Sequence, residues 1–208
     1  YNAVADDWVG ITPGTDGLFI LSLVHCLMKA GRIDLDYLAR LTDAPCLVNA
    51  DEGSDEFGLI LRDEAGKALV LDRRTGKPAA FDGKGVQPDL SGSWRHAGFT
   101  HRPVLHHMAE RYLTDEYAPE TIAEKVGIDA KRIRAIAADI ARVAFDEAIE
   151  LDREWTDFRG ETHKKMIGRP VAFHAMRGIS AHSNGFQTCR ALHLLQIILG
   201  SVEVPGGF

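Results

Sequence analysis

The stretch FHAMRGISAHSNGFQTCRALHLLQIILG, residues 173–200, decides the fold that we expect for this chain. It opens with the end of an apolar run (Val171 to Phe173), continues as a polar loop (Arg177 to Gly185) and closes with a strongly apolar run (Cys189 to Leu199). This order predicts a strand, a loop and a helix. In open α/β sheets, ligands dock at such a crossing because loop N–H groups and the positive end of the helix lie at the carboxyl edge of the sheet. The loop is therefore a candidate wall of a cofactor site.

A second crossing of the same kind is expected near the start of the chain. WVGI (residues 8–11) favours a strand, TPGTDG (residues 12–17) turns the chain, and apolar residues with helical spacing continue to about residue 30. Thr15 or Asp16 can cap this helix, and spacing alone favours this structural role over ligand binding. The same position also suits a carboxylate and free backbone N–H groups that contact a ligand.

The remaining pattern alternates between helical and extended segments. We expect a fold of the α/β class, with a Rossmann-like, mostly parallel sheet flanked by helices. The whole chain, residues 1–208, is expected to form one α/β region, with a small β-hairpin and loop insertion at 51–100. The other expected elements are a helix at 34–41, a strand at 46–48, and helices at 103–113, 122–126 and from 129 onward.

Composition restricts the class of protein. The chain has 208 residues, of which 45% are hydrophobic and 26% charged, and this describes a globular protein with a core. The net charge of −6 argues against a broad nucleic-acid footprint. The three cysteines form no CxxC and are expected to be small buried apolar residues. The longest apolar run is too short to span a bilayer, no signal peptide is found, and both ends look cut, so we expect an excerpt of a larger chain.

Two further patterns are candidate functional sites. One is the two-helix pattern of a helix-turn-helix DNA-binding unit, found in PETIAEKVGIDAKRIRAIAADIA (residues 119–141), but the acidic residues of this segment argue against that function. His101, His106 and His107 offer imidazoles without a cysteine or carboxylate at metal-ligand spacing. No residue is therefore assigned as a metal ligand, and no catalytic residue is assigned.

Polar side chains gather at the loop between residues 174 and 185. His174 and His182, with Ser180, Ser183 and Asn184, provide donors and acceptors that suit an anionic ligand rich in hydrogen bonds. The alternative is a loop that only caps its own helix through Ser183 or Asn184. Spacing leaves both alternatives open.

Four segments in a fixed order resemble the dimethyl sulfoxide reductase family of molybdopterin oxidoreductases, in the catalytic subunit. Together they span nearly the whole chain, and at one position, Ala181, the family often has Gln instead. The segments are ADDWVGITPGTDG (5–17) with GRIDLDYLARLT (31–42), YAPETIAEKVGIDAKRIRAIAADIA (117–141), RPVAFHAMRGISAHSNGFQTCRALHLLQIILG (169–200) and SVEVPGGF (201–208).

The resemblance implies a role for particular residues. The cofactor would be molybdenum bis(molybdopterin guanine dinucleotide) in the intact enzyme, and the isolated chain is expected to be inactive and to bind little or none of it. An iron–sulfur cluster would belong to a part of the subunit outside this chain. The implied cofactor-binding residues are Gly14, Thr15 and Asp16 at the guanine dinucleotide, and Arg177, Gly178, Ala181 and His182 near the pterin.

The resemblance also implies partners and a substrate class. The segment HAMRGISAHSNG (174–185) and the insertions at 56–99 and 152–168 are similar to those of the family branch that handles sulfite, thiosulfate, tetrathionate or polysulfide. Implied partners are the remaining domains of the same polypeptide, a membrane anchor subunit, and an iron–sulfur electron-transfer subunit, with no nucleic acid. A cytoplasmic or partner-mediated membrane location is favoured over a periplasmic one. A non-catalytic scaffold module with the same fold is the alternative function.

Overall fold

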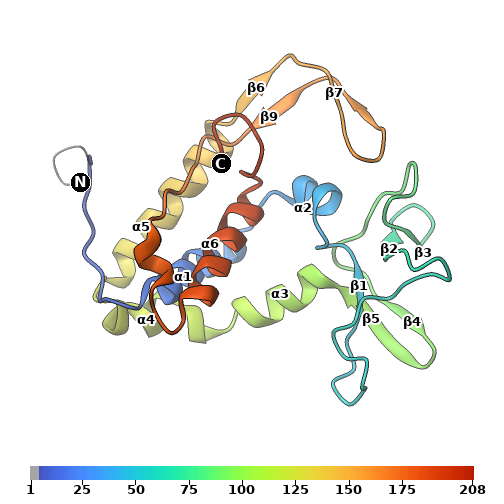
Figure 1. Cartoon of the computed structure of the whole chain (residues 1–208), viewed down its shortest axis with the longest axis horizontal. Helices are drawn as coiled ribbons and strands as arrows, with labels where there is room; N and C mark the ends of the chain where they lie inside the picture. Colours follow the sequence, from blue (N-terminus) through green and yellow to red (C-terminus); the bar gives the residue numbers. More distant parts are fainter. Residues whose placement is uncertain (1–4) are drawn as a thin grey trace. The chain divides into compact units, whose positions relative to one another are not determined.

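The computed structural model describes residues 5–208 (Figure 1). The chain divides into two compact units. Unit 1 takes in the described residues up to Ile33, together with Tyr112–Glu150 and Ile167–Phe208. Unit 2 takes in Asp34–Arg111 and Leu151–Met166. Each unit is therefore built from segments that are far apart in the sequence.

Unit 1 is a helical assembly in which α1 (Asp16–Lys29) packs against three other helices, α4, α5 and α6 (Figure 1). The buried side chains that α1 contributes include Val24 and Leu27, and α6 contributes Leu195 and Ile198. Burial of these apolar side chains is the main source of the unit's stability. The other elements of the unit are η1 (Asp115–Tyr117), α4 (Pro119–Val126), α5 (Ala130–Ala141), the π-turn η2 (Arg142–Asp146), η3 (Arg177–Ser180) and α6 (Gly185–Leu199).

Local sequence signals set the helix boundaries. Gly31 follows α1 with a φ of +64°, and Gly127 ends α4 with a φ of +73°, a conformation that glycine adopts without strain. The Asp129 side chain accepts a hydrogen bond from the Lys131 N–H at 2.8 Å and so caps α5. The expected ends of α1 and α4 and the cap of α5 are confirmed, whereas α4 starts at Pro119 and not at the expected residue 122.

Unit 2 contains short strands and two helices. Its three-stranded sheet has the order β1-β5-β4, formed by β1 (Leu47–Asn49), β5 (Phe99–Pro103) and β4 (Trp94–His96). The hairpin β2 (Leu69–Asp72) with β3 (Lys77–Ala80) lies within the expected insertion, and β7 (Trp155–Thr156) pairs with β8 (Thr162–His163). The helices are α2 (Leu35–Leu41), which Asp34 caps as expected, and α3 (Val104–Tyr112), whose last residue belongs to unit 1.

Two more strands, β6 (Ile149–Leu151) and β9 (Met166–Gly168), form a two-stranded ribbon. The segment that they enclose carries β7 and β8, which belong to unit 2. Among residues 5–208, none of the helices is both long enough and apolar enough to span a bilayer.

The expectation of a mostly parallel, Rossmann-like sheet is wrong. The pairings β1–β5, β4–β5, β2–β3 and β7–β8 are all antiparallel. Residues 8–11 and 171–173, which were expected to be strands, have no regular secondary structure. A strand requires a neighbour whose N–H and C=O groups pair with its own, and β-favouring residues do not reveal whether that neighbour exists. The chain is mixed α/β with small antiparallel sheets.

Candidate functional site

A groove in unit 1 brings together the two turns that the sequence pointed to. It has a volume of about 350 Å³ and lies between the turn before α1 and the turn before α6. These turns are separated by about 160 residues in the sequence, and both precede a long helix. The residues that line the groove are Ile11, Pro13, Gly14, Asp16, Met176, Gly178, Ile179 and His182.

The first wall is a turn anchored at both ends. The Thr12 N–H donates to the Val126 carbonyl at 2.9 Å, and the Thr15 hydroxyl donates to the Thr12 carbonyl at 2.7 Å. Gly14 has a φ of +82°, which other residues adopt only with strain. Neither Thr15 nor Asp16 caps α1 with its side chain, because Thr15 Oγ1 is used within the turn. The capping role that spacing favoured is therefore wrong for this turn.

The second wall is the 3₁₀ turn η3, held against the start of α6. The Ser180 hydroxyl donates to the Arg177 carbonyl at 2.9 Å and closes the turn. A Cβ atom on Gly185 would lie 2.2 Å from the Ser180 carbonyl oxygen, which is far inside van der Waals contact. Only glycine therefore fits where the turn meets the helix.

A single side chain connects the two walls. Asn184 Nδ2 donates to the Gly14 carbonyl across 170 positions of sequence, at 3.3 Å. Behind it, α1 and α6 approach closely, because a Cβ on Gly17 would lie 2.9 Å from Thr188 Oγ1. The sequence pattern offered Asn184 either as a contact to an anionic ligand or as a helix cap, and its side chain makes no capping hydrogen bond. No local pattern could have revealed a partner so distant in sequence.

Three side chains at the groove or beside it remain available to a ligand. Asp16, Arg177 and His182 have no hydrogen bond or ion pair with another side chain in the part of the chain that the structure describes. Asp16 is the first residue of α1, where unsatisfied N–H groups and the helix dipole favour an anion. The groove therefore offers a carboxylate acceptor, an imidazole and helix N–H donors to one ligand. This donor and acceptor set fits a nucleotide, which carries both a base edge and phosphate.

The expected cofactor-binding residues divide into two groups by position. Gly14, Asp16, Gly178 and His182 line the groove. Thr15, Arg177 and Ala181 adjoin those residues in sequence and are outside the lining. Arg177 and Ala181 are both exposed. The binding role of all seven residues stays a prediction.

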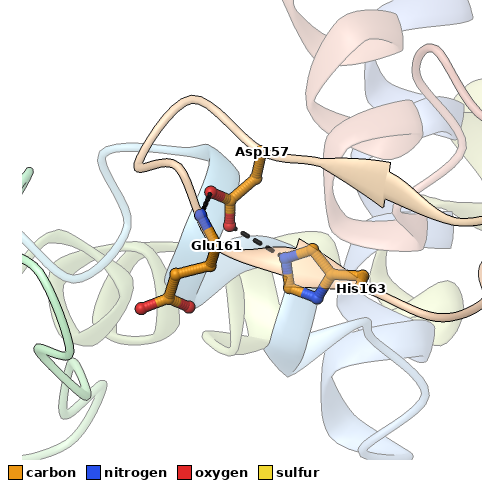
Figure 2. Close-up of side chains that lie close together, drawn as sticks. All are labelled: Asp157, Glu161 and His163. Carbon is orange, nitrogen blue, oxygen red and sulfur yellow. Dashed lines mark hydrogen bonds and ion pairs between the residues drawn. The ribbon is translucent and has the colours of Figure 1, made fainter.

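A second cluster, in unit 2, has the composition of a metal site. Asp157, Glu161 and His163 offer one ligand atom each, all within 4.8 Å of one another. Figure 2 shows the Asp157 carboxylate facing both the Glu161 N–H and the His163 ring. These bonds are 2.9 Å each, and Asp157 also accepts from the Arg159 N–H. The carboxylate is therefore already satisfied by the protein.

The tautomer of His163 argues against a metal there. Arg40 NH1 lies 3.1 Å from His163 Nδ1, and since a guanidinium only donates, Nδ1 must accept. The ring proton is then on Nε2, which donates to Asp157 Oδ2. Nε2 presents no lone pair to an ion. We therefore interpret the cluster as a set of hydrogen bonds that stabilises the β7–β8 hairpin.

The cysteines show no sign of metal or disulfide chemistry within residues 5–208. All three are free; Cys46 is buried, and Cys26 and Cys189 are half-buried. Burial, with the nearby Asp43 carboxylate, raises the pKa of Cys46 to about 11. A thiol with so high a pKa is protonated near neutral pH and is a poor nucleophile or ligand.

The α4–α5 pair uses its basic residues within unit 1. Arg134 forms a bidentate ion pair with Glu120 on α4, with Nε 3.2 Å from Oε1, and Arg132 pairs with Asp7. Ile122 and Ile133 are fully buried. These contacts favour a packing role for the pair over DNA binding.

Comparison with known proteins places the chain among oxidoreductase subunits, although no protein-family model matches it. Over 100% of its length it is 40% identical to a sulfite dehydrogenase subunit of Allochromatium vinosum, of which it covers 22%. Over 64% it is 28% identical to a putative dimethyl sulfoxide reductase catalytic subunit of Halobacterium salinarum, of which it covers 16%. Over 65% it is 27% identical to the alpha subunit of the perchlorate reductase of Dechloromonas aromatica, of which it covers 19%. The chain thus spans about one fifth of the length of these relatives.

Proposed function

The chain matches a fragment of molybdopterin oxidoreductase catalytic subunits, and from this premise we propose that its groove binds a guanine dinucleotide end of the molybdenum cofactor. One observation carries the proposal. Gly14 and Asp16 share a cavity of about 350 Å³ with Gly178 and His182, although the two pairs are far apart in sequence. A ligand in this cavity contacts both turns at once.

Each residue of the groove has a separate task in this proposal. The Asp16 carboxylate accepts hydrogen bonds from the donor edge of the base, and the N–H groups at the start of α1 meet phosphate. Gly14 and Gly178 have no side chain, so the backbone of both turns approaches the ligand closely. His182 and Arg177 provide donors on the side of η3. When bound, the metal and pterin supply the redox chemistry, and these residues bind and orient them.

The proposal extends to the whole subunit. The relative with 40% identity is a sulfite dehydrogenase subunit, which supports a sulfur oxyanion as substrate. An iron–sulfur cluster elsewhere in the subunit would take up or deliver electrons. A membrane anchor and an iron–sulfur electron-transfer subunit would be its partners, with a cytoplasmic or membrane-associated location. In the alternative, a non-catalytic scaffold module, the intact subunit would contain no guanine dinucleotide.

A single substitution tests the role of the groove. In the full-length subunit, Asp16→Asn removes the charge and places an amide donor where an acceptor is required. Loss of a charged hydrogen bond costs about 1.5–3 kcal/mol, so the guanine nucleotide retained per molecule should fall about tenfold or more under dilute conditions. The measurement is the nucleotide released by acid hydrolysis after gel filtration.

The matched control is Asp36→Asn, because Asp36 is an aspartate in unit 2 whose side chain is 92% exposed. This variant should retain nucleotide like the natural subunit. Full retention by Asp16→Asn would remove Asp16 from the site. A natural subunit that contains no guanine nucleotide would favour the scaffold alternative.

A further inference from the structure

Asn184 occupies the N-cap position of α6 without acting as a cap. Its φ and ψ are −99° and 11°, and its side chain accepts no hydrogen bond from the first turn of the helix. Its amide nitrogen instead donates to the Gly14 carbonyl at 3.3 Å. The backbone carbonyl of Asn184 meanwhile accepts from the Thr188 N–H and hydroxyl, at 3.0 and 3.2 Å. The residue is therefore fixed to α6 at its backbone and reaches α1's turn with its side chain.

Behind this bond, close approaches hold α1 and η3 against α6. Gly17 lies so close to Thr188 that a methyl group would contact Oγ1 at 2.9 Å, which fixes α1 against α6. Gly185 lies even more closely against the Ser180 carbonyl, where a methyl group would lie 2.2 Å from the oxygen, and this fixes η3 against α6. The turn that contains Gly14 is different, because Gly14 has nothing within 4 Å of where its Cβ would be. The turn is held to unit 1 through the Thr12 N–H, which donates to the Val126 carbonyl, while Gly14 itself protrudes from it.

Within residues 5–208, the Asn184–Gly14 bond is the only hydrogen bond that joins residues 11–16 to residues 176–185. Both of these segments line the groove. Packing of α1 and η3 against α6 places the two walls, and one side chain makes the direct hydrogen bond between them. We propose that Asn184 is a positioning residue that holds the walls of the groove at the spacing its ligand requires. This inference rests on the proposed function of the groove.

The role of a positioning residue differs measurably from that of a helix cap. Asp is as good an N-cap as Asn, and its charge also favours the helix dipole, so a capping role predicts that Asn184→Asp is harmless. Asp has no N–H donor, however, and would set a carboxylate against the Gly14 carbonyl oxygen. A positioning role therefore predicts that Asp performs at least as badly as Ala. A capping role predicts that Asn184→Asp binds the ligand better than Asn184→Ala, and a positioning role predicts that it binds no better.

The experiment uses the full-length subunit loaded with its cofactor. Asn184→Ala and Asn184→Asp are compared with Gln187→Ala, since Gln187 is an exposed residue of the same helix whose side chain accepts a hydrogen bond from Arg190. The rate at which guanine nucleotide and fluorescent pterin leave the protein is measured at a fixed temperature. Loss of one hydrogen bond should speed release about two- to tenfold in Asn184→Ala, with release from Asn184→Asp at least as fast. Gln187→Ala should release at the natural rate.

The thermal midpoint of each variant separates positioning from folding. We expect Asn184→Asp to keep the natural midpoint while it loses cofactor faster. Natural release rates in both variants would overturn the inference, as would fast release from Asn184→Ala alone. If the natural subunit holds the nucleotide and only Asp16→Asn loses it, the proposed function stands and the role of Asn184 is wrong. If the natural subunit holds none, the proposed function and this inference both fail.

Discussion

Gly185 and Gly178 belong to the same loop yet have opposite surroundings. A Cβ on Gly185 would lie 2.2 Å from the Ser180 carbonyl oxygen and 2.5 Å from its carbon, whereas Gly178 has nothing within 4 Å. Because the obstacle is backbone, Gly185→Ala forces η3 away from α6, and we expect a loss of about 1–3 kcal/mol in the free energy of unfolding. Chemical denaturation of the full-length subunit, followed by circular dichroism, measures this loss.

Gly178→Ala is the matched variant for that measurement. Its free energy of unfolding should change by less than about 0.5 kcal/mol, because the added methyl group meets no atom of the protein. Gly178 lines the groove, so the same variant should still weaken ligand binding by occupying ligand space. Equal stability losses in the two variants would show that the close contact at Gly185 does not exist.

Asn184 shows how far single residues can be understood from sequence. A polar residue before an apolar run suggests a cap, because capping partners lie two or three positions away. The actual partner of its side chain is the Gly14 carbonyl, 170 positions away. The loop pattern singled out His182 and the resemblance added Gly14, but which of the seven candidates share a cavity depends on how α1 packs against α6. That packing is a property of the folded chain.

At the scale of the element, helices were predictable and strands only in part: the strand expected at 46–48 is β1, whereas 8–11 and 171–173 are not strands. The start of α2 at Asp34 and the stop of α4 at Gly127 depend on neighbours within four residues. Strand pairing depends on distant partners. Val48 pairs with Arg102 and Trp94 with His101, which no local pattern specifies. The prediction of a parallel sheet was therefore wrong because it assumed that two β-favouring segments, 8–11 and 171–173, each had a neighbouring strand to pair with.

The β7–β8 hairpin should have a stability that depends on acid. Burial acts to raise the pKa of Asp157, but hydrogen bonds from His163 and from the Glu161 and Arg159 N–H groups outweigh it and hold that pKa below its usual value. A carboxyl whose pKa is lower in the folded state contributes stability above its unfolded pKa of about 3.9. That contribution is lost as the pH falls through the folded pKa. The hairpin should therefore open below about pH 4.

Hydrogen exchange at the Arg159 and Glu161 amides measures this opening, because both donate to Asp157 Oδ1. Protection corrected for intrinsic exchange should be constant from pH 7 to pH 5 and fall on further acidification. Asp157→Asn should have low protection that varies little with pH. Asp152→Asn, whose side chain is 93% exposed in the same segment, should behave like the natural protein. A flat profile in the natural protein would contradict the role of the carboxylate.

At the scale of the whole molecule, unit 1 presents apolar side chains on its surface. Trp8, Met176 and Phe186 are 67%, 62% and 73% exposed, and Met176 also lines the groove. Large exposed apolar side chains are typical of interfaces where they form a continuous patch. This agrees with a chain that spans about one fifth of its relatives, in which other parts of the subunit would cover such side chains.

The isolated 208-residue polypeptide should accordingly have no catalytic activity. Its groove supplies two turns for one end of a cofactor, and its free cysteines and the satisfied Asp157 cluster supply no ligand set for a metal among the described residues. Catalysis requires reacting groups held in fixed geometry, which one wall of a cofactor site does not achieve. With reduced viologen as donor and tetrathionate as acceptor, oxidation of the viologen should equal the rate without protein. The loaded full-length subunit provides the positive control, and circular dichroism verifies that the helices of the polypeptide have formed. Turnover by the folded polypeptide above that background would mean that it contains a complete redox site, and the proposed division of labour within the subunit would be wrong.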